Sequence, residues 1–215
     1  MRRLLHGLLG ATLLLGACGN DDDDGDRAAV TSIPEESISS TSSTTTEPRT
    51  VAPDVIPQDV DLITEEYVEQ VLNELYEVSL QSFMVAREAG LVEEQAMALI
   101  EATNSETVYT QQVNDLLALS ATGFEGMRPT PSAVEVSVVE LLAASPSCVV
   151  AEVTTDASGL MDNSTPADPE ERSFVRLLVA SESQRQTGLN PTAWVFDEFP
   201  VTFDHSEPQL GCEGL

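Results

Sequence analysis

The chain has 215 residues, 41% of them apolar, and a formal charge of −28 that results from 37 acidic and only nine basic residues. All nine basic residues are arginines. So few cations argue against nucleic acid and against anionic lipid surfaces as partners, because both are bound through clustered lysine and arginine. The charge itself indicates solubility and mutual repulsion, not a particular fold.

Residues 1–17 are expected to be an export signal. Arg2 and Arg3 form a positive start, and residues 4–15 form an apolar stretch that is too short to span a bilayer of about 30 Å. Leu-Gly-Ala-Cys follows at residues 15–18 and resembles the lipobox of bacterial lipoproteins. The resemblance implies that Cys18 is lipidated, with the membrane as a partner through that lipid, at the outer face of the cytoplasmic membrane. A secretory signal with a chance cysteine is the alternative.

Residues 18–60 are expected to be the lipid anchor and a disordered, acidic, Ser/Thr/Pro-rich tether. Residues 21–24 are four consecutive aspartates, and nine of the ten residues in 37–46 carry a hydroxyl. Such a segment cannot bury enough apolar surface to offset the entropy that ordering would cost. O-glycosylation of the hydroxyl-rich stretch is the alternative to a plain linker.

Residues 61–215 are expected to form one domain, whose first half is helical. Thr64 is a candidate N-cap, and Gly90 is a candidate stop for a long first helix. Its apolar residues recur at three- and four-residue steps, and they include Val68, Val71, Leu72, Leu75 and Val78. Further helices are expected over 92–102 and 113–119, with a short strand at 107–110.

The second half of the domain is expected to form a sheet. Apolar residues alternate or run continuously between turn residues, and the predicted strands cover 133–144, 148–155, 172–181 and 192–199. Two to three helices followed by four antiparallel strands predict an α+β domain, in which the N-terminal helices pack on a curved sheet.

The order of these elements, together with the late aromatic strand that contains Trp194, resembles the NTF2-like family of ketosteroid isomerases and SnoaL-like proteins. The resemblance spans about residues 61–203 and implies a cone-shaped domain; a cystatin-like arrangement is the main alternative. Many actinobacterial lipoproteins similarly combine a lipobox, a Ser/Thr tether and a small α+β domain. An isomerase-like site would need an inward aspartate and a donor such as Tyr67, Tyr76 or Tyr109. The spacing selects none of them, so no catalytic residue is transferred.

Two cysteines, Cys148 and Cys212, remain once Cys18 is assigned to lipid. An even pair in an exported protein predicts a disulfide, which would tie the C-terminal tail to the sheet. Two free thiols are the alternative.

No catalytic, cofactor-binding or metal-binding set is predicted. His205 is the only histidine outside the export signal, and its chain neighbours Asp204 and Ser206 cannot form a triad with it. One histidine is too few for an ordinary zinc site. No nucleophile elbow, phosphate-binding loop or H-E-x-x-H motif occurs.

The carboxylates on the predicted strands are expected to lie on solvated faces. They are Glu135, Glu152, Asp197 and Glu198. Strand alternation predicts that Asp197 lies on the face opposite Glu198.

These patterns predict a lipid-anchored cell-envelope protein whose domain binds without catalysing a reaction. The partner would be an envelope protein, a wall component or a small apolar ligand, reached through the outer sheet face or the acidic loop at 156–171. The alternatives are an NTF2-like enzyme acting on a small hydrophobic substrate, or an accessory subunit of an envelope transporter or secretion complex. Val68, Leu72, Leu75 and Trp194 are expected to line the inner side of the sheet, which side chains are expected to fill.

Overall fold

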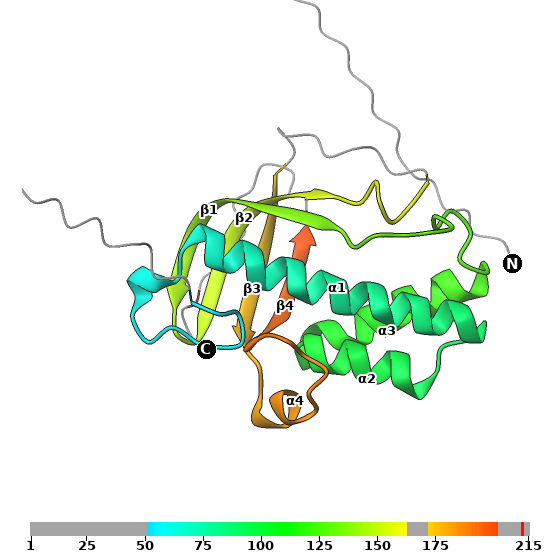
Figure 1. Cartoon of the computed structure of the whole chain (residues 1–215), viewed down its shortest axis with the longest axis horizontal. Helices are drawn as coiled ribbons and strands as arrows, with labels where there is room; N and C mark the ends of the chain where they lie inside the picture. Colours follow the sequence, from blue (N-terminus) through cyan, green and yellow to red (C-terminus); the bar gives the residue numbers. More distant parts are fainter. Residues whose placement is uncertain (1–50, 163–171, 202–211, 213–215) are drawn as a thin grey trace, which may run out of the picture. The chain divides into compact units, whose positions relative to one another are not determined.

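The structure, a computed structural model, describes residues 51–162, 172–201 and 212. Their elements are η1 (Val60–Leu62), α1 (Glu65–Ala89), α2 (Glu94–Thr103), α3 (Glu106–Ala121), β1 (Glu135–Ser145), β2 (Cys148–Asp156), β3 (Ser173–Val179), α4 (Glu182–Gln186) and β4 (Trp194–Val201) (Figure 1). This order confirms the predicted α+β class. Cys18 and His205 lie outside the described residues.

The strands form an open antiparallel sheet in the order β1-β2-β3-β4. Each strand is hydrogen-bonded to the next one along the chain, which confirms the predicted meander. The β1–β2 hairpin turns through Pro146 and Ser147, and the backbone N–H of Cys148 donates to Ser145 Oγ (3.1 Å). β1 and β4 are therefore the two edges of the sheet.

α1 begins and ends where the sequence predicts. Thr64 Oγ1 accepts a hydrogen bond from the N–H of Tyr67 (3.2 Å), and the helix ends at Gly90, whose φ of 70° is left-handed. A hydroxyl N-cap and a glycine in that conformation are the usual ends of a helix. The predicted apolar residues at 68, 71, 72, 75 and 78 are all buried.

The 25 residues of α1 extend for roughly 37 Å and contact two apolar clusters. The first half packs on the sheet with Trp194 and Phe196, and the second half packs against α2 and α3. Figure 1 shows α1 lying across the strands, with α2 and α3 beside its C-terminal half. The sheet core and the helical core are thus joined by one helix.

Side chains of α1 also form hydrogen bonds with backbone groups at the outer edge of β1. Asn73 Nδ2 donates to the carbonyl of Val136 (3.1 Å), and the N–H of Val136 donates back to Asn73 Oδ1 (3.0 Å). Glu69 Oε2 accepts from the N–H of Val138 (3.0 Å). An unpaired strand edge can recruit another chain, so these bonds protect β1 against that pairing.

The strand expected at 107–110 is wrong, because these residues lie in the first turns of α3. β-Branched and aromatic residues favour a strand locally, but Val108 and Leu116 are buried at helical spacing. The extended backbone lies just upstream. Asn104 forms a parallel bridge with Phe196, and the N–H of Ser105 donates to the carbonyl of Phe196 (2.7 Å).

The last residues assigned to the tether pack on the domain. Tyr67 Oη donates to the carbonyl of Val55 (2.9 Å), and the N–H of Ala193 donates to the carbonyl of Pro53 (2.9 Å). Ile56 packs against the sheet core. The folded part of the chain therefore begins upstream of residue 61.

Candidate functional site

Side chains fill the helix-covered face of the sheet. The four residues expected to line it are each at most 1% exposed and belong to one cluster: Val68, Leu72, Leu75 and Trp194. The Nε1–H of Trp194 donates to Tyr67 Oη (2.7 Å), so the polar atom of the indole is also satisfied. At these four residues the packing agrees with the expectation of a filled interior.

A cleft of about 590 Å³ lies outside this core, between the α2–α3 junction, α4 and the β3–β4 pair. We call it the α2–α4 cleft. Its polar lining comprises Glu101, Asn104, Ser105, Glu106, Ser181, Ser183 and Gln184, and its apolar lining comprises Tyr109, Leu178, Val179 and Val195. The sequence did not predict a site here.

α4 forms one wall of the α2–α4 cleft. Ser181 Oγ accepts from the N–H of Gln184 (3.2 Å), and Gln184 Oε1 accepts from the N–H of Ser181 (3.0 Å), which is a capping box. Gln184 Nε2 donates to the carbonyls of Glu101 (2.7 Å) and Asn104 (2.8 Å), so it holds α4 against the end of α2. The Ser-x-x-Gln spacing is a sequence signal for a helix start that could have predicted α4.

Two residues that line this cleft each have a buried side-chain oxygen with no hydrogen-bond partner among the described residues. These oxygens are Asn104 Oδ1 and Ser105 Oγ. Asn104 is 5% exposed, and its Nδ2 already donates to the carbonyl of Ile100 (2.7 Å) and to Thr103 Oγ1 (3.1 Å). Ser105 is the N-cap of α3, yet its hydroxyl makes no capping bond. An unsatisfied buried polar atom costs about 1–3 kcal/mol, so a ligand that reorients these side chains and donates to their oxygens would recover free energy.

The charged groups that line the cleft are both acidic. Glu101 precedes the end of α2 and Glu106 begins α3, and both side chains are exposed. None of the described residues that line the cleft is basic. The cleft therefore offers hydrogen-bond acceptors and negative charge beside an apolar wall.

A second, smaller cavity of about 200 Å³ lies between α1, α3 and the segment that leads into β1. Its lining includes Tyr76, Leu80, Phe83 and Val134, and none of the described lining residues carries a carboxylate. The Tyr76 ring contacts the ring of Phe196 edge-on, with centroids 5.2 Å apart. Burial raises the pKa of Tyr76 well above its ordinary value of 10.0.

Two tyrosines should make the fold sensitive to alkali. Burial also raises the pKa of Tyr67 above 10.0, an effect that the hydrogen bond from Trp194 partly offsets. Because both pKa values are raised in the folded state, the stability that depends on the neutral hydroxyls is complete below about pH 10 and falls above it. Urea unfolding from pH 8 to 11.5 should show this fall. It should be shallower in Tyr76→Phe; an unchanged slope in this variant would contradict a buried, neutral Tyr76.

The expectation of a solvated Asp197 is wrong. Asp197 is 7% exposed, and its Oδ2 accepts from Arg176 Nε at 2.7 Å; Glu198 Oε2 lies 3.7 Å from Arg176 Nη2. In the β3–β4 register Arg176 pairs with Glu198 and Leu177 pairs with Phe196, which leaves Asp197 as the extra residue of a bulge. A bulge interrupts the alternation of faces, so both carboxylates approach the same guanidinium. Alternation had predicted opposite faces.

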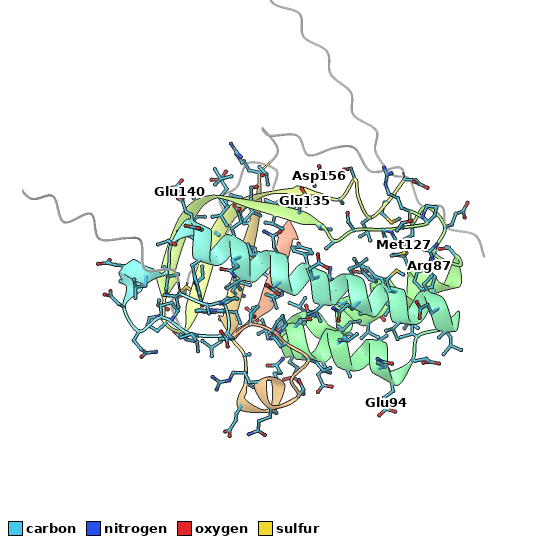
Figure 2. The ribbon with its side chains drawn as sticks, viewed as in Figure 1. Arg87, Glu94, Met127, Glu135, Glu140 and Asp156 are labelled. Atoms are coloured by element: carbon cyan, nitrogen blue, oxygen red, sulfur yellow. A yellow bond between two sulfur atoms is a disulfide. The ribbon has the colours of Figure 1, made fainter. Side chains whose placement is uncertain are left out.

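The other strand carboxylates differ in exposure. Figure 2 shows Glu135 and Glu140 along β1, where both are exposed. Glu152 Oε1 lies 3.4 Å from Arg172 Nε. Of the four strand carboxylates that were expected to be solvated, Glu135 fits the expectation best, because it is exposed.

Loss of the Asp197 carboxylate should destabilise the sheet. Asp197→Ala removes the closest partner of Arg176, which is only 22% exposed, and we expect a loss of about 2–3 kcal/mol in the free energy of unfolding. The loss is measured as a lower urea midpoint, with an unchanged dependence of the free energy of unfolding on urea concentration. Glu140→Ala, which removes an exposed carboxylate from β1, should change stability by less than about 0.5 kcal/mol. Equal effects of the two substitutions would contradict a structural ion pair.

Cys148 and Cys212 are joined by a disulfide, as the cysteine count predicts. Their Cα atoms lie 5.7 Å apart, and Cys148 is fully buried at the start of β2. The bond therefore ties a residue near the C-terminus to an inner strand of the sheet.

The acidic loop at 156–171 is described only as far as residue 162. That part is bonded to the segment that follows α3: Met161 bridges Met127, and the N–H of Asp162 donates to the carbonyl of Gly126 (2.7 Å). Arg87, near the end of α1, donates from Nη1 to the carbonyl of Arg128 in the same segment (2.8 Å); Figure 2 labels Arg87 and Met127. Among the described residues, no group of three or more His, Cys, Asp or Glu side chains could hold a metal ion.

No protein-family model, curated protein or solved structure matches this chain. Within the described ranges, no helix combines the length and the apolar character needed to cross a membrane.

Proposed function

We propose that the protein is a lipid-anchored component of the cell envelope whose domain binds a ligand or partner in the α2–α4 cleft without turning it over. The Leu-Gly-Ala-Cys sequence that ends at Cys18 and resembles a lipobox supports the anchor at the outer face of the cytoplasmic membrane. The pair of unpartnered, buried oxygens at Asn104 and Ser105 carries the binding claim, because both residues line a polar cleft that lies outside the apolar core.

The site chemistry favours binding over catalysis. Asp197, the most buried of the strand carboxylates, is held by Arg176 at 2.7 Å. The small cavity beside Tyr76 has no carboxylate among its described lining residues, so an isomerase-like proton transfer lacks its base there. We therefore favour a binding domain. An NTF2-like enzyme and an accessory subunit of an envelope complex are the two alternatives.

The finer fold class is also a proposal. Three helices followed by a four-strand meander support an NTF2-like arrangement over a cystatin-like one. The extended residue Asn104, bridged to Phe196 between α2 and α3, stands where that family would have its short strand.

The anchor is tested by fractionation and intact mass. The protein in the membrane fraction should carry a diacylglycerol adduct, and Cys18→Ala should lose both the adduct and membrane retention. A wild-type protein that is unmodified and freely secreted would contradict the anchor.

The binding claim is tested on the ¹⁵N-labelled full chain in detergent, with a panel of cationic, anionic and polyhydroxylated small molecules. At least one class should shift the side-chain amide of Asn104 and the backbone amide of Ser105. If no class shifts these resonances, a ligand site in the cleft is refuted.

A further inference from the structure

We propose that the α2–α4 cleft binds an organic cation, that is, a primary ammonium or guanidinium group on an apolar stem. A lysine or arginine side chain of a peptide and a free polyamine share this chemistry. The inference rests on the proposed function, since it names the ligand class of the same cleft.

The charge of the cleft selects a cation. Glu101 and Glu106 line it from the end of α2 and the start of α3, and no basic residue is among its described lining. The chain as a whole carries −28, which raises the local concentration of cations around the domain. An anionic ligand would meet like charge without a compensating arginine.

The unpartnered atoms select a hydrogen-bond donor. Asn104 Oδ1 is a carbonyl oxygen and can only accept. The amide nitrogen of the same side chain already donates to Ile100 and Thr103. Ser105 Oγ is also without a partner among the described residues. An ammonium group carries three donors and no acceptor, so the number of its donors equals these two oxygens plus one carboxylate. Hydrogen bonds from a charged donor are about twice as strong as neutral ones.

The apolar wall selects the stem. Tyr109 lines the cleft from α3, and Leu178 and Val195 line it from β3 and β4. Aliphatic carbons of a lysine-like stem can pack on these side chains while the charged head reaches the acceptors. The Tyr109 ring can also attract a cation that lies over its face.

The test is calorimetric titration of the full chain in detergent with N-acetyl-lysine amide and with spermidine, against the neutral N-acetyl-norleucine amide. We expect both cations to bind and the neutral analogue to bind at least about tenfold more weakly. Tighter binding of the lysine amide would identify a peptide side chain as the source, and tighter binding of spermidine a free polyamine.

Two matched double variants distinguish binding in the cleft from attraction by the overall negative charge of the protein. Glu101→Gln/Glu106→Gln should weaken binding of the cation about three- to tenfold, in line with two exposed charge pairs. Glu77→Gln/Glu88→Gln removes two exposed charges of α1 outside the cleft lining and should leave binding within about twofold. Equal losses in both pairs would overturn the proposal.

Two further results separate failure of this inference from failure of the proposed function. If the norleucine amide binds as tightly as the lysine amide and shifts Asn104 and Ser105, the cation claim is overturned and the binding cleft stands. If neither these probes nor the wider panel shifts those residues, both claims fail together.

Discussion

Trp194→Ala should destabilise the domain by about 3–5 kcal/mol, the usual cost of truncating a large buried aromatic side chain. Trp194 is 0% exposed and packs in the same cluster as Leu72 and Leu75. Its indole also donates to Tyr67 Oη (2.7 Å), and that hydroxyl donates to the carbonyl of Val55. The substitution therefore opens a cavity and removes the donor that connects the sheet core to the N-terminal segment. Urea unfolding monitored by circular dichroism measures the loss.

Trp194→Phe separates the two contributions. It keeps most of the apolar volume but removes the indole N–H, so we expect a smaller loss of about 1–2 kcal/mol. A loss below about 1 kcal/mol in Trp194→Ala would contradict a filled interior, because a side chain at the edge of an open pocket can be truncated cheaply.

Removal of the disulfide should cost about 4 kcal/mol in the free energy of unfolding. Cys148 and Cys212 are separated by 64 positions, and a crosslink that closes a loop of this length restricts the unfolded chain by about that amount. The double variant Cys148→Ala/Cys212→Ala should therefore unfold at a lower urea concentration than the wild type.

Two controls accompany this prediction. The wild type in reductant should approach the stability of the double variant, and the same reductant should leave the double variant unchanged. Thiol labelling of the native, unreduced chain should find neither Cys148 nor Cys212 reactive. Labelling of both would contradict the disulfide.

The elements that the sequence predicted well are those that local signals specify. Thr64, Gly90 and the apolar residues between them define α1 through interactions within a few turns of chain, and the structure has α1 at these bounds. The strands likewise followed from runs of apolar residues between turn residues. Cys148 and Cys212 could be paired by count once Cys18 was assigned to lipid.

The features that the sequence did not predict depend on contacts between distant segments. The position of Asp197 depends on how β4 pairs with β3, and one extra residue in that register reverses its face. Residues 107–110 favour a strand locally but form the first turns of α3, where Val108 is buried. The α2–α4 cleft is formed by segments far apart in sequence, such as Asn104 and Gln184, which are 80 positions apart. No periodicity within either segment could have indicated that contact.

The proposed function requires that the ligand binds in the α2–α4 cleft and not in the core on the helix-covered face of the sheet. Chemical-shift mapping on the ¹⁵N-labelled full chain tests this requirement most directly. Trp194 is the only tryptophan, so its indole N–H gives a single resonance that reports on the sheet core. With N-acetyl-lysine amide, we predict shifts at Asn104, Ser105 and Gln184 and an unchanged indole resonance. A sterol or fatty acid that shifts the Trp194 indole while these three residues stay unchanged would contradict the proposal, since it would place the ligand site inside the sheet.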